Sequence, residues 1–312
     1  MIPRGSPVRE RGAVAVAAGR KEVGVVRRAS AFLFRHPRAK LSLSLGGPLA
    51  WFLVIYIGSL LMLFVTAFWY LDVFTSEIVH EVTLKNFQPL WENDVYRTIT
   101  LRTVGIAGAV AIADVLLSFP LAYYAARLAT PRMRNALLIA VVLPLWANYL
   151  VRIFAWKIIL TPNGFLNWLV EFTGAGSLQL GRSNWAVWIA FVYLWLPFTL
   201  LPIYGALERI PNSYLEASGD MGARGWTTFR NVVFPLILPG IVAGSIFSFS
   251  LTLGDYITPE LVGNTQFIGN VIFDNVGVAG NIPFAAAYAM VPVAIMAIYL
   301  LLAKRAGAFE AL

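Results

Sequence analysis

The chain has 312 residues, of which 59% are hydrophobic and only 13% are charged, against roughly 25% charged residues in a typical soluble domain. This composition excludes an ordinary soluble globule, which needs a polar surface, and indicates a polytopic membrane protein. The sequence has no cysteine and only two histidines, so we expect no disulfide scaffold and no metal site in this chain.

The first 47 residues form a basic segment ahead of the first apolar run. Ten of their side chains are Lys or Arg, within a background rich in Gly and Ala. The apolar run that follows is too long for a signal peptide, although the composition also allows a transit peptide. We predict that residues 1–47 are a partly disordered cytoplasmic tail, which its charge holds near anionic lipid rather than nucleic acid.

Six apolar runs are long enough, at about 20 residues each, to cross a bilayer as helices. They are Pro48–Leu71, Leu101–Tyr124, Ala136–Trp156, Trp185–Leu207, Leu236–Ile257 and Ala285–Ala303. No run has the two-residue period of a lipid-facing barrel strand, and only helices or closed barrels satisfy the backbone in lipid. The sequence therefore predicts an all-α membrane protein with a transmembrane domain over residues 48–305 and a short C-terminus at 306–312.

Lys and Arg predict how the spans are oriented. Eighteen of these residues lie before the first span, after the second, after the fourth or after the sixth, whereas the opposite loops hold only Lys85, Arg97, Lys157 and Arg182. The side with the excess is cytoplasmic by the positive-inside rule. We therefore expect both termini in the cytoplasm and an acidic external loop between Asp72 and Arg97.

The loop over residues 208–235, between the fourth and fifth spans, carries the clearest local signals. Ser213 and Glu216 have the spacing of a capping box at a helix start, and Gly222 suits the left-handed residue that ends such a helix. One helical face would hold Tyr214, Ala217, Ser218 and Met221. A simple connector needs no such helix, so we expect it to dock in a groove on a cytoplasmic partner.

The same loop resembles the EAA loop of bacterial ABC importer permeases. That pattern is Glu-Ala-Ala, three residues, Gly, nine residues and Ile-x-Leu-Pro, and here it corresponds to Glu216, Ala217, Ser218, Gly222 and Pro235. The sequence departs from it at Ser218, Val232 and Phe234. Further stretches resemble the spermidine/putrescine (polyamine) permease group of the binding-protein-dependent transport inner-membrane family: Pro120–Tyr124, Leu143–Arg152, Gly254–Gly263, Ile268–Ile272 and Pro283–Ala287.

The resemblance implies the transmembrane domain of a type I ABC importer in the bacterial inner membrane. This chain would form half of a pathway for a small cationic solute, beside a second homologous permease and below an extracytoplasmic solute-binding protein. Two ATPase subunits would bind ATP and Mg, leaving this chain without a cofactor, and Glu216, Ala217, Ser218, Gly222 and Pro235 would couple to them. The absence of Walker, His-Glu-x-x-His and Gly-x-Ser-x-Gly motifs also indicates a chain that is not an enzyme.

Two alternatives stay open. The chain could be an ABC importer permease for another small solute, such as ferric ion, sulfate, molybdate or an amino-acid-like compound. It could also be an ion-coupled secondary carrier, which would use membrane carboxylates such as Asp114 as coupling groups. Asp114 lies near the middle of the second span, where the cost of a charge predicts that it faces the interior of the bundle.

A polyamine path needs spaced carboxylates and aromatic faces for cation–π contact. The candidates are Trp146, Asn148, Tyr149, Arg152, Asp255, Tyr256, Glu260 and Asp274. Arg152 is the one cation in this set, and pairing with Asp255 would neutralise it. Gly240 and Gly244 place small residues on one face of the fifth span, which predicts close helix packing, either within the chain or against the second permease.

Overall fold

The computed structural model describes residue 34 and residues 37–174 and 180–305. Most of the predicted tail at 1–47 and all of residues 306–312 therefore lie outside the described residues. The chain divides into two compact units, residues 1–63 and residues 64–312, and each is described by itself.

The first unit contains the start of a long apolar helix. Helix α2 (Pro37–Trp51) continues through a π-helical segment, η1 (Phe52–Ile57), into α3 (Gly58–Thr66). The stretch Ser44–Thr66 is long and apolar enough to cross a membrane. The first predicted span was therefore placed too late: the helix has ended before Tyr70–Leu71, which form strand β1.

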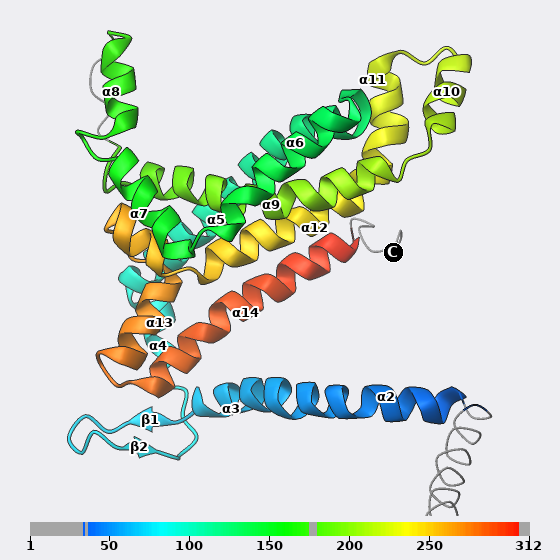
Figure 1. Ribbon diagram of the computed structural model, residues 1–312. Coiled ribbons are helices and arrows are strands. Elements are labelled where there is room, and N and C mark those ends of the chain that lie inside the picture. The colour runs from blue at the N-terminus through cyan, green and yellow to red at the C-terminus, as the bar shows by residue number, and fades with distance from the viewer. Residues whose placement is uncertain (1–33, 35–36, 175–179, 306–312) are drawn as a thin grey trace, which may run out of the picture. The chain divides into compact units, whose positions relative to one another are not determined.

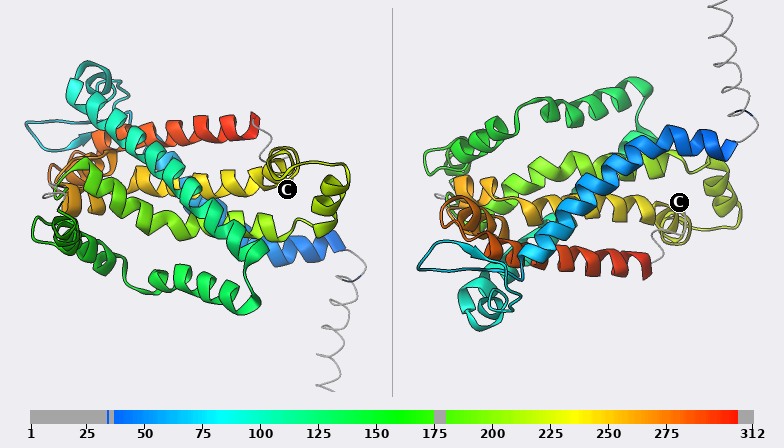
Figure 2. Two further views of the ribbon diagram at one scale, coloured as in Figure 1. Left: turned by 90° about the horizontal axis from the view of Figure 1, so that it is seen from above. Right: turned by 90° about the horizontal axis from the view of Figure 1, so that it is seen from below.

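Three long helices form the centre of the second unit. They are α5 (Asp94–Tyr123), α9 (Asn184–Glu208) and α12 (Phe234–Gly254), and they pack side by side in all views (Figures 1 and 2). The α5 helix runs on through the π-helical segment η2 (Tyr124–Leu128), and α14 (Ile282–Arg305) packs against α12. Over both units, the described residues contain five helices of spanning length, or six with one bent pair. This confirms the all-α membrane fold.

The third predicted span is not one straight helix. The run divides into α6 (Pro131–Val142), a 3₁₀ turn η3 (Leu143–Trp146) and α7 (Tyr149–Ile159), and the pair is bent by 99°. Ala147 and Asn148 are extended, and the Asn148 side chain accepts a hydrogen bond from the Leu150 N–H at 2.9 Å. The break arises because Asn148 starts a new helix and caps it.

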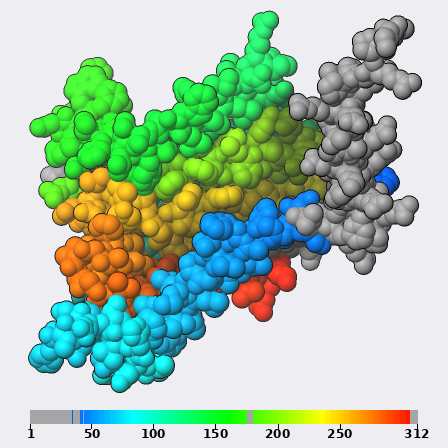
Figure 3. All heavy atoms as spheres, turned by 60° about the horizontal axis from the view of Figure 1, so that its bottom comes forward, coloured from blue at the N-terminus to red at the C-terminus, as the bar shows by residue number. Residues whose placement is uncertain are grey.

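Shorter elements lie at the two ends of the second unit (Figure 1). One end, called the hairpin end, has the antiparallel pair β1 and β2 (Ile78–Val79), α4 (Gln88–Glu92), α8 (Phe165–Phe172), η5 (Pro259–Gly263) and α13 (Ile268–Gly277). The opposite end, called the loop end, has α10 (Asn212–Asp220), α11 (Gly225–Thr228) and the π-helical segment η4 (Phe229–Val233). Figure 3 shows the hairpin region in cyan beside α13 in orange.

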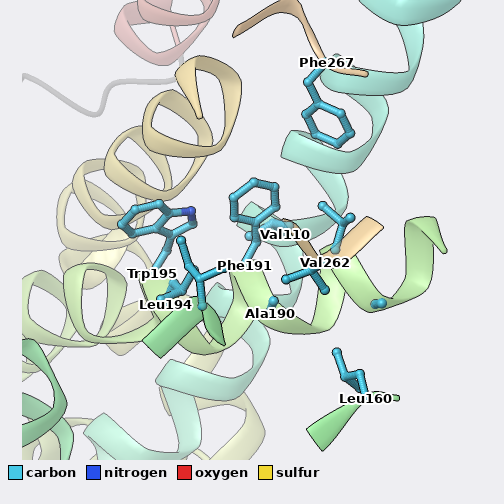
Figure 4. Packing of buried hydrophobic residues seen from close by; sticks show 11 residues of the cluster. Val110, Leu160, Ala190, Phe191, Leu194, Trp195, Val262 and Phe267 are labelled. Carbon is cyan, nitrogen blue, oxygen red and sulfur yellow. The ribbon is translucent and has the colours of Figure 1, made fainter. Parts of the chain in front are cut away.

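Buried apolar side chains hold η5 against the long helices. Figure 4 shows Val110 of α5, Phe191 and Trp195 of α9, and Val262 of η5, with Phe267 nearby. Phe191 lies 6.1 Å from Phe267 between ring centroids. The segment that follows α12 is therefore packed in a defined place, and so are the polar groups that it carries.

Candidate functional site

The α10 helix at the loop end does not begin as the sequence pattern predicts. Its N-cap is Pro211, which has no side-chain capping bond, and Ser213 already lies within the helix. The predicted capping box is therefore wrong, because an N-cap residue must itself be non-helical to accept from the first turn. Glu216 is exposed and has no capping role.

The other end of α10 is a Schellman motif. Gly222 has a φ of 75°, its N–H donates to the Gly219 carbonyl at 2.8 Å, and the Ala223 N–H donates to the Ser218 carbonyl at 3.1 Å. These two bonds satisfy carbonyls that the helix end leaves free. The prediction that Gly222 adopts the left-handed conformation and ends the helix is confirmed.

Ser218 differs from the other residues of the predicted face. It is 3% exposed, and its hydroxyl shares a 2.9 Å hydrogen bond with the Thr228 hydroxyl. Ser218 therefore ties α10 to α11, whereas Glu216 and Ala217 face solvent and Met221 is 81% exposed. The exposed surface of α10 thus combines two carboxylates, those of Glu216 and Asp220, with apolar side chains.

Pro235 is the second residue of α12 and directly follows the π-helical segment η4. Residues Gly225 to Gly254 run as one 30-residue helical rod through η4. The end of the loop is therefore continuous with a long helix of the core.

Arginines anchor the start of the loop. Arg127 of η2 donates to the carbonyls of Leu207 and Ile210, each at 2.7 Å, and to the Asn212 side chain at 2.9 Å. Arg134 of α6 forms a longer, exposed ion pair with Glu208 at 3.5 Å. In the sequence these arginines are only orientation signals, because the partners of Arg127 lie 80 to 85 residues away in the chain.

A polar cluster at the hairpin end joins α7 to the segment after α12. The Asp255 carboxylate accepts hydrogen bonds from the N–H groups of Ile257 and Thr258 at 2.8 and 3.0 Å, from the Thr258 hydroxyl at 3.2 Å and from the Tyr149 hydroxyl. Burial raises the pKa of the Asp255 carboxyl above its ordinary value, while the bonds from Thr258 and Ile257 oppose that rise. Asp255 therefore acts first as a cap and tether within its own chain.

Arg152 is not the partner of Asp255, contrary to the expectation from sequence. Its guanidinium lies over the Tyr149 ring, 5.8 Å from the centroid, and its buried Nε has no hydrogen-bond partner among the described residues. Tyr149 occupies the position between the two charges, because its hydroxyl reaches Asp255 while its ring meets Arg152. The arrangement brings three predicted pathway residues together through one aromatic side chain.

The other predicted pathway residues do not join this cluster. Trp146 is 85% exposed, Glu260 is exposed, and the Tyr256 ring stacks on Phe273 at 4.5 Å. Within the described ranges, Asp274 has no side-chain bond to Asp255 or Tyr149. The exposed residues of the predicted set are thus Trp146, Glu260 and Asn148, and the Asn148 side chain is the cap of α7.

Gly240 and Gly244 meet α9 of the same chain. A β-carbon at Gly240 would stand 2.7 Å from the Pro202 carbonyl oxygen, and one at Gly244 would stand 2.8 Å from that of Thr199. The Thr199 hydroxyl also donates to the Gly244 carbonyl at 3.2 Å. Of the two possibilities left open by the sequence, the geometry favours packing within the chain.

Asp114 is fully buried in the three-helix core, and its partner is Ser248 of α12, whose hydroxyl donates to the carboxyl group. The sequence predicted an inward-facing Asp114 but could not identify this partner, which is 134 residues away. The available signal in the sequence was that Ser248 lies on the same face of the fifth span as Gly240 and Gly244.

The family comparison identifies this architecture of long-helix core, broken span and loop helix as the transmembrane subunit of an ABC importer. A family model described as "Binding-protein-dependent transport system inner membrane component" matches residues 96–307, which is more than half of the chain. The chain belongs to this family, and it is a non-catalytic permease subunit of the type I fold. The alternative of an ion-coupled secondary carrier is therefore set aside.

The chain is also similar to two named permeases in sequence and to one solved transporter in fold. The inner membrane ABC transporter permease protein YdcU of Escherichia coli (strain K12) is 45% identical over 297 residues, which cover 91% of this chain and 95% of that protein. The spermidine/putrescine transport system permease protein PotB of Haemophilus influenzae is 32% identical over 230 residues, covering 72% and 80%. A bacterial alginate ABC transporter in complex with an alginate pentasaccharide-bound periplasmic protein has the same fold, with a TM-score of 0.66, 15% identity and coverage of 88% and 96%.

Proposed function

We propose that α10 is the coupling helix through which this permease binds an ATPase subunit. The observation that carries the proposal is the combination of a helix held at both ends and an exposed surface. Arg127 holds its start, the Schellman motif and the Ser218–Thr228 bond hold its end, and Glu216 and Met221 stay accessible. A preformed helix binds without the ordering cost that a flexible loop would incur.

The proposal assigns a side of the membrane to each end of the second unit. The loop end is cytoplasmic and the hairpin end external, in agreement with the Lys and Arg distribution. In the assembly that we propose, two ATPase subunits bind ATP and Mg, a second permease completes the pathway, and an external solute-binding protein delivers the solute. The periplasmic protein in the alginate transporter complex supports the last of these partners.

Two measurements test this assignment. A reporter fused after Glu216 should be cytoplasmic, and reporters fused after Glu81 or Glu171 should be external. The tagged permease should also co-purify with an ATPase subunit, and a Glu216→Lys variant should lose it while remaining in the membrane. An external reporter at Glu216, or unchanged ATPase recovery with Glu216→Lys, would contradict the proposal.

We further propose that the solute is a polyamine. The identity with PotB supports this substrate class, as do the acidic and aromatic side chains at the hairpin end. Because the Asp255 carboxylate is already bonded within the chain, the exposed Glu260 and the exposed Trp146 are the groups that would meet an ammonium ion. Asp255 would keep the turn that carries Glu260 in place.

Uptake of labelled spermidine by the complete complex in proteoliposomes, with its binding protein, tests the substrate. We expect uptake that unlabelled putrescine inhibits and that sulfate and molybdate do not. Glu260→Gln should lower uptake, whereas Glu77→Gln, which removes an exposed charge from the hairpin, should not. Uptake of another solute without spermidine uptake would refute the polyamine proposal while leaving the permease assignment intact.

A further inference from the structure

The C-terminal end of α9 is stabilised by a side chain from another helix. A helix end leaves up to four carbonyl groups without intrahelical partners. Two carbonyls at this end, those of Leu207 and Ile210, accept hydrogen bonds from one guanidinium nitrogen of Arg127, each at 2.7 Å. A cation here also interacts favourably with the negative end of the helix dipole.

The second nitrogen of the same guanidinium reaches the coupling helix itself. It donates to the Asn212 side chain at 2.9 Å, and Asn212 is the first residue of α10. The planar fork of an arginine allows these contacts to be made together, which a lysine ammonium cannot reproduce. Arg127 therefore contacts both the helix that ends at the loop and the helix that begins it.

The position of Arg127 in the chain means that its contact joins α5 to the coupling loop. It lies in η2, the direct continuation of α5, and α5 is not adjacent in sequence to the coupling loop. The loop is covalently joined to α9 and to the rod that becomes α12. α5 also meets the loop through apolar packing, since Phe119 lies 5.4 Å from Phe229 between ring centroids and Leu215 of α10 joins the same apolar cluster. Arg127 adds a directional polar link between α5 and the start of α10.

We infer that Arg127 is a positioning residue that makes α5 follow the movement of the coupling helix. This inference rests on the proposed coupling function of α10, and it adds a third helix to those that the loop drives directly. The ion pair between Arg134 and Glu208 does not substitute for it, because that pair joins α6, and not α5, to the end of α9.

Coupling is measured as substrate transported per ATP hydrolysed by the reconstituted complex with its binding protein. Arg127→Gln removes the charge and most of the donors, and we expect about a tenfold fall in this ratio, the effect of losing one charge-assisted hydrogen bond. Because Arg127 also holds the start of α10, ATPase binding is measured in parallel, and the ratio is taken only for complexes that retain the ATPase. Arg127→Lys should retain part of the coupling, and Arg132→Gln, an exposed arginine five residues further on, should retain all of it.

A rescue experiment separates transmission from a purely structural role. The chain has no cysteine, so Arg127→Cys with Asn212→Cys gives a unique pair of thiols at the two ends of the contact. A bifunctional thiol reagent that bridges the pair should restore the transport-to-ATP ratio, and a monofunctional reagent should not. Restored coupling supports the inference even if Arg127→Gln lowers the yield of folded complex.

Two results would overturn the inference. One is an unchanged transport-to-ATP ratio in Arg127→Gln; the other is a bridged pair that stays uncoupled. Both results are obtained with a wild-type complex that retains its ATPase. If the coupling-helix proposal itself were wrong, α10 would not be needed for ATPase binding, and Glu216→Lys would leave the recovery of the ATPase unchanged.

Discussion

Substitutions at Gly222 isolate the backbone conformation that ends the coupling helix. The residue has a φ of 75°, and a β-carbon added there would meet nothing within 4 Å. Any cost of a side chain therefore comes from the left-handed conformation and not from a clash. That cost is about 1–2 kcal/mol for an ordinary L-residue, more for a β-branched residue, and least for asparagine.

This energy translates into a loss of docking. If the loop adopts its docking conformation less often, the apparent affinity for the ATPase falls in proportion to the population lost. A cost of one to two kcal/mol corresponds to a factor of roughly 5–30. We therefore expect Gly222→Ala to weaken ATPase binding by about this factor, Gly222→Val to abolish transport with the permease still in the membrane, and Gly222→Asn to be the mildest change.

Titration of the purified ATPase subunit against the permease in nanodiscs measures these affinities directly. Gly219→Ala is the matched control, because Gly219 is in the same helix, has equal free space and lacks a positive φ. The reasoning would be refuted if Gly219→Ala weakened binding as much as Gly222→Ala. It would also be refuted if Gly222→Asn were as damaging as Gly222→Val, since the order must follow the backbone preference.

Three further substitutions test separate contacts. Gly244→Ala should lower the free energy of unfolding in detergent by about 1–3 kcal/mol through overpacking against Thr199. Gly205→Ala, where an added β-carbon would meet nothing within 4 Å, should not lower it. Equal stabilities of the two variants would disprove the close approach of Gly244 to α9. Tyr149→Phe should lower it by about 1.5–3 kcal/mol by removing a donor to Asp255, and Tyr256→Phe, whose ring is stacked on Phe273, should not. Ser218→Ala should speed hydrogen exchange in α10 and α11 by breaking the bond to Thr228. Ser213→Ala, at an exposed position, should leave the exchange unchanged. Faster exchange in Ser213→Ala but not in Ser218→Ala would instead support the capping box.

The sequence predicted the spans well because their length and apolarity are local properties. The sequence predicted one straight third span where the helix is bent, because a proline by itself does not mark a break. Prolines such as Pro197, Pro202 and Pro239 lie inside helices that continue through them. What distinguishes Pro144 is the extended pair that follows it and the cap that Asn148 supplies. Neither is visible in a hydropathy profile.

The candidate site was predictable only where one residue determines the local backbone. Gly222 could be assigned because only glycine readily adopts its conformation. The capping box was assigned wrongly because its spacing also fits the interior of a helix that starts after Pro211. The partners of Asp114 and Arg127, and the Tyr149 hydroxyl that reaches Asp255, come from distant segments, so no local pattern contains them.

The polar contacts found within the core explain how a movement at the loop end can reach the hairpin end. An uncompensated polar group is costly in an apolar medium, so these bonds resist separation of the helices they join. Ser248 ties α12 to Asp114 of α5, and Thr199 ties α9 to Gly244 of α12. The three core helices should therefore shift together when the coupling loop moves.

The broken span is the element that this shift must carry along. At the loop end, Arg134 at the start of α6 pairs with Glu208 at the end of α9. At the hairpin end, α12 stops at Gly254, and the next residue, Asp255, accepts a hydrogen bond from Tyr149 of α7. The weak exposed pair can slip while the buried bond holds, and the extended residues between α6 and α7 can absorb the difference. We therefore expect α7 to follow α12 more closely than α6 follows α9, so that the hairpin end opens or closes by a change in the bend and not by a tilt of the whole span.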